Sequence, residues 1–137
     1  MDVATIPRPA SDHVDGGVTA AESKAMLRAV LNLLDRWDLS RAEKLVLLGG
    51  PSDRTFHRWR AGDISPLPTD TVYRLGDLLA IHQALRHMFT DAERGYKWVK
   101  RPNDVFAGRS ALEVMLQGSP VDLNRVRAYL DAERGGW

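Results

Sequence analysis

The sequence contains no cysteine, and this absence removes three classes of site at once. A disulfide framework, a thiol nucleophile and a cysteine-ligated metal centre are all excluded from its 137 residues. A chain of this length buries a working core without such crosslinks. The absence of cysteine also fits a reducing compartment, and we expect a cytoplasmic protein.

Long apolar stretches are lacking as well. The longest run, LVLLGG, ends at Gly49 and Gly50 and falls far short of the roughly 20 residues that a membrane span needs. The first residues, MDVATIPRPASDHVDGG, lack the charged-then-apolar order of a secretory signal. We therefore expect no membrane partner.

Patterns typical of catalysis and metal binding are also missing. The sequence has no Gly-x-Ser-x-Gly motif and no phosphate-cradling glycine loop. Its histidines show no metal-ligand spacing, and His82 falls on an apolar helical stripe, where packing in the core is the better interpretation. We predict a protein that is not an enzyme and that holds no metal and no cofactor.

No segment shows the alternation of a convincing strand, whereas apolar residues recur at helical spacing from Thr19 onward. Prolines and glycines among polar residues make 1–18 an expected mobile arm. The pattern predicts an all-α fold, with a helix-turn-helix unit and its connecting helix over 19–89 and a second helical unit over 90–137. The connecting helix is expected over 69–89.

Several polar residues stand where helices should begin. Thr19 with Glu22, and Ser40 with Glu43, have the spacing of capping boxes. Ser52 should cap a helix that closes at Gly62, and Ser110 and Ser119 precede two later helices. The remaining expected caps are Thr69 or Ser65 for the connecting helix and Thr90 for the helix after it.

Positive charge gathers in one window of a chain whose net charge is only +1. Residues 36–60 hold six Lys or Arg against three Asp or Glu, so the window carries +3 and the remainder −2. A local basic patch is the electrostatic footprint of a nucleic-acid face, although a solvated helical surface gives the same pattern.

The stretch LSRAEKLVLLGGPSDRTFHRWRAG has the length, tight turn and polarity of a helix-turn-helix. Small Ala42 is expected where the two helices cross, and Phe56 and Trp59 should face the core. The outer side chains of the second helix are then the candidate DNA-binding residues: Ser52, Arg54, Thr55, His57, Arg58 and Arg60. The alternative is a helical hairpin with a basic surface.

At these residues the chain resembles a known family. The order Leu39-Ser40, Leu48-Gly49, Pro51-Ser52, Arg54-Thr55, Trp59-Arg60, Gly62 resembles the helix-turn-helix of Xre-like antitoxins. The later order Trp98, Pro102-Asn103, Phe106, Gly108-Arg109-Ser110-Ala111-Leu112, Met115-Leu116 and Gly118, followed by an amphipathic helix, resembles the toxin-binding domain of the MbcA/ParS/Xre antitoxins. The apolar face of that last helix is expected to hold Val121, Leu123, Val126, Tyr129 and Leu130. Many members have proline where Ala111 stands, so Ser110 alone should set that turn.

The resemblance implies an antitoxin of a type II toxin–antitoxin system. Its partners would be operator DNA, whose operon it represses, and a RES-domain toxin that consumes NAD or transfers ADP-ribose from it. The antitoxin would occlude the toxin's NAD pocket and act as a homodimer within a larger complex. The toxin-binding residues expected on this basis are Asn103, Gly108, Arg127, Asp131, Arg134, Gly135, Gly136 and Trp137.

Two other classes of protein stay open from the residues alone. One is a stand-alone transcriptional regulator whose C-terminal unit only dimerises it, and the other is a small enzyme. Trp137, the last residue after two glycines, is either a loose end or an anchor for a partner's cleft.

Overall fold

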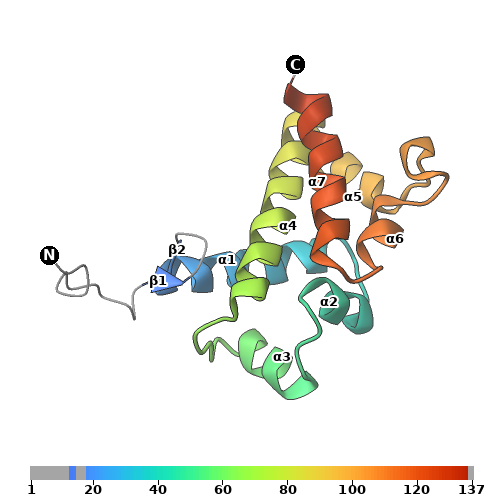
Figure 1. Ribbon diagram of the computed structural model, residues 1–137. Helices are drawn as coiled ribbons and strands as arrows, with labels where there is room; N and C mark the ends of the chain where they lie inside the picture. The colour runs from blue at the N-terminus through green and yellow to red at the C-terminus, as the bar shows by residue number, and fades with distance from the viewer. Residues whose placement is uncertain (1–12, 15–17, 136–137) are drawn as a thin grey trace, which may run out of the picture.

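The computed structural model describes residues 13–14 and 18–135, and this part of the chain is almost entirely helical (Figure 1). The prediction of an all-α fold is confirmed. The helices are α1 (Ala20–Arg36), α2 (Arg41–Leu47), α3 (Asp53–Arg60), α4 (Thr69–Met88), α5 (Ala92–Lys100), the 3-10 helix η3 (Asp104–Phe106), α6 (Ala111–Met115) and α7 (Pro120–Gly135).

One small antiparallel strand pair precedes the helices. Strand β1 (His13–Val14) pairs with β2 (Val18–Thr19), with His13 opposite Thr19. The expectation of no strand is therefore wrong at these positions. The physical reason is local: Thr19 caps α1 with an extended backbone, φ −80° and ψ 165°, and Val18 packs against the core. The N-cap Thr19, with its extended backbone, therefore also serves as the last residue of β2.

The ends of the helices largely follow the polar signals. Capping boxes form at Thr19 with Glu22, at Ser40 with Glu43, and at Ser110 with Glu113, and the Ser52 side chain caps α3. The predicted capping boxes at Thr19 and Ser40 and the predicted caps Ser52 and Ser110 are confirmed, because each needs only the geometry of four consecutive residues.

Two expected caps are wrong. Pro68 is the N-cap of α4, where neither Ser65 nor Thr69 takes that position. Pro68 already has the extended backbone that a cap requires, with φ −60° and ψ 150°. Asp91, rather than Thr90, caps α5, and its carboxylate accepts from the backbone N–H of Glu93 at 3.0 Å. An aspartate is the stronger cap of the two.

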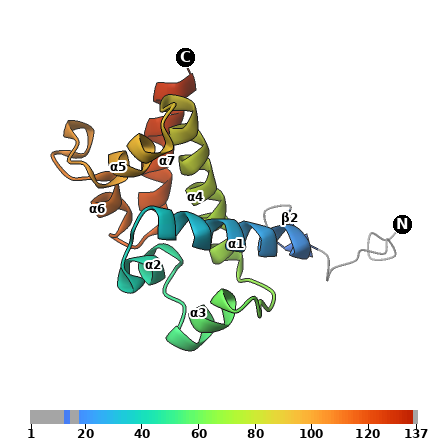
Figure 2. The same cartoon turned by 180° about the vertical axis from the view of Figure 1, so that it is seen from behind.

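Helices α4 and α7 form the central packed pair of the molecule. They lie side by side and run in the same direction, while α1 crosses α4 at its lower half (Figures 1 and 2). Helices α2 and α3 lie at one end and the C-terminal turn of α7 at the other. The buried residues of both predicted units join in one hydrophobic core, which includes Trp37, Leu75, Met115 and Leu130.

Arg74 of α4 is a buried charge at the junction of the two units. It is 6% exposed, and its Nε donates to Asp70 Oδ2 at 2.9 Å. Its Nη2 donates to the carbonyl of Gly118 at 2.9 Å, just before α7, and its Nη1 lies 3.5 Å from the carbonyl of Val46 in α2. One guanidinium therefore fastens α2, α4 and the α6–α7 turn together.

Two apolar positions lie differently from the sequence-based expectation. Ala42 is exposed on α2, so it does not fill a crossing between helices. Val121, expected on the apolar face of α7, is 72% exposed, whereas Leu123, Val126 and Leu130 are fully buried. Two residues advance a helix by about 200°, so Val121 faces away from the stripe that begins at Leu123.

Candidate nucleic-acid and partner interfaces

The turn between α2 and α3 orients α3 so that one side of this helix packs on the core and the other is exposed. Gly49 and Gly50 both have positive φ, +93° and +75°, which favours glycine, and a Cβ on Gly49 would lie 3.0 Å from Arg74 Nε. Phe56 and Trp59 anchor α3 with exposures of 3% and 6%, as predicted. The opposite side of α3 is therefore fixed toward solvent.

The candidate DNA-binding side chains lie on different sides of α3 and differ in their surroundings. Arg54, His57 and Arg58 are exposed at helical spacing, on the side away from Phe56 and Trp59. Among the described residues, the side chains of Arg54 and His57 have no hydrogen bond or ion pair. They are thus the groups most available to a partner.

The other candidates are already engaged within the protein. Arg58 Nε contacts Asp63 Oδ2 at 3.1 Å, and Arg60 Nη1 contacts both oxygens of Asp35 at 3.2 Å. The Ser52 hydroxyl donates to Thr55 Oγ1 at 3.0 Å and accepts from the Thr55 backbone N–H. These contacts position α3 and its caps.

Asp35 joins three helices through its carboxylate. Asp35 belongs to α1, and its carboxylate accepts hydrogen bonds from Lys44 of α2 and from Arg60 of α3. The hydrogen bond from Lys44 is the main cause that holds the pKa of Asp35 below its usual value, and the pair with Arg60 adds to it. Arg60 therefore belongs to the support of the helix-turn-helix.

The acidic residue at the start of α3 is neutralised from the neighbouring helix. Arg41 Nη2 lies 3.1 Å from Asp53 Oδ1, and the Arg41 guanidinium lies over the Phe56 ring at 5.1 Å. Asp53 consequently does not present an unpaired negative charge beside the α3 surface.

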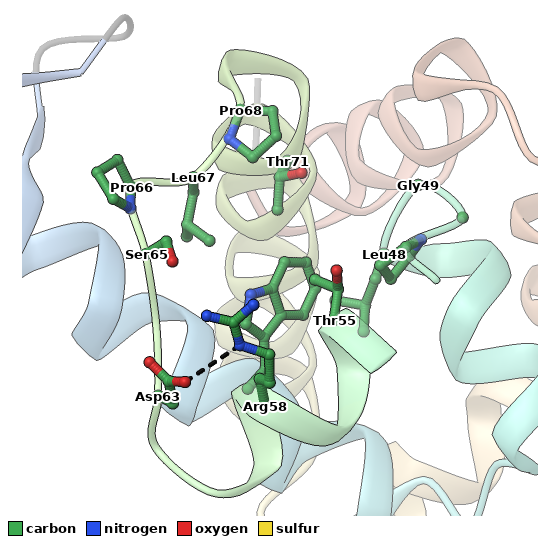
Figure 3. A pocket seen from close by; sticks show the side chains of 13 residues that line it. Leu48, Gly49, Thr55, Arg58, Asp63, Ser65, Pro66, Leu67, Pro68 and Thr71 are labelled. Atoms are coloured by element: carbon green, nitrogen blue, oxygen red, sulfur yellow. Dashed lines mark hydrogen bonds and ion pairs between the residues drawn. The ribbon is translucent and has the colours of Figure 1, made fainter. Parts of the chain in front are cut away.

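A pocket of about 420 Å³ opens beside α3 (Figure 3). It lies between the α2–α3 turn and the loop that leads to α4, and Thr55 and Arg58 of α3 line it. Figure 3 shows the Arg58 guanidinium reaching across the loop side of this pocket to Asp63. A basic group thus borders a hollow next to the exposed face of α3.

The loop of Asn103 and Gly108 is a closed turn. Asn103 Oδ1 accepts from the Val105 N–H at 3.0 Å, and the Asn103 carbonyl accepts from the Gly108 N–H at 3.0 Å. Ala107 and Gly108 have positive φ, +58° and +86°. Asn103 therefore shapes the loop, and the loop presents Val105, 47% exposed, to solvent.

An aromatic cluster holds this loop against α7. Trp98 stacks on Tyr129 with ring centroids 6.3 Å apart, and the Phe106 ring meets Tyr129 edge-on at 5.6 Å. Burial raises the pKa of Tyr129, and its hydroxyl donates to Glu133 at 3.1 Å. Trp98 is 8% exposed, so it is part of the core.

The remaining candidate toxin-binding residues lie along α7. Arg127 Nη1 contacts Asp77 of α4 at 3.0 Å and Arg127 Nε lies 3.6 Å from Asp131, so Arg127 fastens α7 to α4. Asp131 and Arg134 are exposed in the last turns, where Gly135 ends the helix. Gly136 and Trp137 lie outside the described residues.

The candidate toxin-binding residues that the structure describes do not form one patch. The loop around Asn103 and Gly108 lies to the side of the molecule, while Arg134 is in the end turn of α7 (Figures 1 and 2). Sequence reasoning missed a third surface, a groove of about 750 Å³ between α4 and the start of α7. It contains Tyr73, 53% exposed, and Val121, 72% exposed. Arg127 also lines it, which is the one candidate toxin-binding residue of the sequence analysis among its described lining residues.

The described residues show neither a metal cluster nor a membrane span. Within 13–14 and 18–135, no three histidine, aspartate or glutamate side chains gather in a metal-binding arrangement. In the same part of the chain, no helix combines the length and apolar character needed to cross a bilayer.

The geometry defines a helix-turn-helix protein that carries a second helical unit on a shared core. Comparison with known families agrees with this class in both halves. Residues 17–78 match the antitoxin Xre-like helix-turn-helix domain, and residues 84–136 match the antitoxin Xre/MbcA/ParS C-terminal toxin-binding domain. The chain belongs to the Xre/MbcA/ParS antitoxin family, and the predicted resemblance is confirmed.

One relative matches most of the chain. The uncharacterized protein y4oB of Sinorhizobium fredii (strain NBRC 101917 / NGR234) is 50% identical over 117 residues, which are 85% of this chain and 90% of the relative. No solved structure matches the chain. The boundary between the two family matches falls at residues 78–84, inside α4, which packs on both α1 and α7.

Proposed function

We propose that this antitoxin neutralises a RES-domain toxin that degrades NAD or transfers ADP-ribose, and that it represses its own operon. The observation that carries the proposal is the pair of family matches on one chain, one to a helix-turn-helix and one to a toxin-binding domain. A repressor and a neutraliser in one molecule need two surfaces, and α3 and the C-terminal turn of α7 supply them.

In the DNA-binding half, α3 enters the major groove. Arg54 and His57 reach base edges or phosphates directly, since neither side chain has an internal partner among the described residues. Arg58 leaves its ion pair with Asp63 and binds a phosphate of the DNA backbone. Breaking this ion pair costs little free energy, because both side chains are about half exposed or more. Ser52, Thr55 and Arg60 keep α3 in position.

In the toxin-binding half, the end of α7 and the following residues occlude the NAD pocket. Asp131, Arg134 and Gly135 lead to Gly136 and Trp137, whose indole offers the large anchoring area that protein interfaces favour. The loop of Asn103 and Gly108 is a second contact, made through the exposed Val105 at its tip. Direct occupation of the pocket competes with NAD, so no conformational relay is needed.

A homodimer within a larger toxin–antitoxin complex completes the proposal. The groove between α4 and α7 supports it, because Tyr73 and Val121 both line this groove and are both exposed. The mass of the purified antitoxin in solution, compared with that of Tyr73→Asp, tests this part.

The test of neutralisation is co-expression with a RES-domain toxin encoded beside the antitoxin. The expected result is restored growth and restored cellular NAD, together with a stable complex on co-purification. A toxin that leaves NAD unchanged, or an antitoxin that co-purifies with no toxin, would contradict the proposal. Enzymatic turnover of NAD by the antitoxin alone would favour the small-enzyme alternative instead.

A further inference from the structure

A separate pocket of about 390 Å³ is lined by residues of α1, α4 and α5. Its apolar part comes from Leu33 of α1 and Leu79 of α4, and its polar part includes Asn32. The volume is within the range of sites that hold small organic molecules. No residue of the candidate DNA or toxin interfaces lines it.

The charges around this pocket all have one sign. Arg36 and Arg86 line it from two helices, and none of its lining residues is acidic. Neither guanidinium makes an ion pair or side-chain hydrogen bond with another described residue, although elsewhere Arg41, Arg58, Arg60, Arg74 and Arg127 all have acidic partners. The two arginines therefore leave positive charge beside the same pocket without an acidic group to offset it, and a guanidinium suits a carboxylate or a phosphate in geometry.

His82 lines the same pocket as the two arginines. Its ring stacks against Tyr96 of α5, with centroids 6.4 Å apart and planes 17° from parallel. Its Nδ1 is buried without a hydrogen-bond partner. Burial is the main cause that lowers the pKa of His82, and the charges of Arg86 and Arg36 lower it further. An anion beside these groups would reverse the electrostatic part of that effect.

We propose that this pocket binds a small organic anion, whose carboxylate or phosphate group lies between Arg36 and Arg86. The guanidiniums hold the anionic group by charge-assisted hydrogen bonds. Leu33, Leu79 and the Tyr96 ring receive a short apolar or aromatic body. Because the site joins α1 to α4 and α5, an occupied pocket braces the helix-turn-helix unit against the C-terminal unit.

The site stands independently of the proposed function, since it needs neither DNA nor toxin. The test uses the full-length protein and follows the His82 ring signals by NMR during pH titration at constant ionic strength. The probes are inorganic phosphate, phenyl phosphate and benzoate, with chloride as the reference anion. The expected result is a rise in the pKa of His82 with bound probe, because a nearby anion stabilises the imidazolium.

Matched variants separate a built site from general attraction. Arg36→Gln and Arg86→Gln should each weaken the organic probe that binds best by about tenfold, the usual effect of losing one charge-assisted hydrogen bond. Both side chains are exposed and unpaired, so the variants should fold as the parent does. Arg94→Gln on α5 removes the same charge outside the pocket and should leave binding unchanged.

The two aromatic probes also identify the anionic group. Stronger binding of phenyl phosphate assigns a phosphate ester, and stronger binding of benzoate assigns a carboxylate; either outcome supports the site. If the aromatic probes bound no more tightly than inorganic phosphate, the claim that Leu33, Leu79 and Tyr96 receive an apolar body would be contradicted. An unmoved His82 signal with every probe, or an equal loss in Arg94→Gln, would overturn the proposal as a whole.

Discussion

Arg54 and Arg60 lie on the same short helix, yet the fold uses them for different purposes. The Arg60 guanidinium binds Asp35 and lies 5.8 Å from the centroid of the Phe56 ring, so it is part of the contact between α1 and α3. Arg54 extends from the outer face of α3 with no internal partner among the described residues. A basic residue that the fold leaves unpaired is the better candidate for nucleic acid.

We expect Arg54→Ala to weaken operator binding without changing the melting temperature. Loss of a phosphate contact should lower the salt dependence of binding by about one ion, whereas loss of a base contact should cost about 1–3 kcal/mol at one operator position. Fluorescence anisotropy over a range of salt concentrations measures both. Arg94→Ala, on α5, is the matched control. Wild-type affinity and salt slope in Arg54→Ala would show that α3 is not the DNA-reading helix.

His82 should make the stability of the protein sensitive to mild acid. Its pKa is lowered from 6.5 in the folded protein, so the unfolded chain binds more protons as the pH falls below that value. Stability is therefore complete above the unfolded pKa and declines as the pH falls through the folded pKa. We expect chemical denaturation to show lower stability at about pH 5.5 than at about pH 7.5.

The control for this pH effect is another histidine on the same helix. His82→Gln should reduce the difference in stability between the two pH values, and His87→Gln, at an exposed position of α4, should retain it. An undiminished pH difference in His82→Gln would assign the acid sensitivity to other groups, first among them the carboxylates that are paired in the fold.

Helix α4 is the element whose role was hardest to predict from sequence. Its apolar stripe was evident from the sequence, but the buried position of Arg74 was not. The Arg74 guanidinium donates a hydrogen bond to the carbonyl of Gly118, 44 residues further along the chain. No local pattern reports such a partner. Capping boxes, by contrast, depend on four consecutive residues, and Thr19, Ser40 and Ser110 could be assigned from sequence alone.

The candidate sites, too, were predictable from sequence only where they depend on local pattern. Helical periodicity predicted the outward face of α3, because Phe56 and Trp59 fix which side is buried. It could not distinguish paired from unpaired arginines there, since Asp35 and Asp63 lie outside α3. The toxin-binding residues came from the family resemblance, and the pocket of Arg36 and Arg86 depends on the packing of three helices.

Arg74→Met should destabilise the whole protein by about 1–3 kcal/mol, the cost of leaving a partly buried acceptor without its donor. The orphaned group is the carbonyl of Gly118, since Asp70 is half exposed and regains water. Thermal and chemical unfolding measure the loss. Because the core is shared, one cooperative transition is expected at lower stability.

A control at the surface isolates this effect. Arg94→Met makes the same chemical change on an exposed part of α5 and should alter stability little. If Arg74→Met unfolded in two separate steps, the helix-turn-helix unit and the C-terminal unit would be independent domains joined mainly by this residue.

At the scale of the whole molecule, the two proposed interfaces lie at opposite ends. Helix α3 is at the lower end in Figure 1, and the C-terminal turn of α7 is at the upper end. Helices α4 and α7 run between them as a parallel pair. Toxin and operator can therefore be bound by different surfaces, and a change at one end should leave the other intact.

We expect removal of residues 131–137 to impair toxin neutralisation and to preserve operator binding. The deletion begins just after Leu130, the last fully buried residue of α7, so the apolar contacts of α7 with the core are retained. It removes the Asp131 partner of Arg127 and the Glu133 partner of Tyr129, but Arg127 keeps its contact with Asp77. Growth and NAD levels during toxin expression report neutralisation, and anisotropy reports operator affinity.

Trp137→Ala tests the same end of the chain without shortening α7. If the indole is the anchor in the NAD pocket, this single change should reproduce most of the loss seen on deletion, at equal protein abundance. Full rescue by both variants would move the inhibitory contact to the loop of Asn103 and Gly108, with its exposed Val105. Simultaneous loss of operator binding in the deletion variant would mean that the last turns of α7 support the fold, because α3 lies too far away to be affected directly.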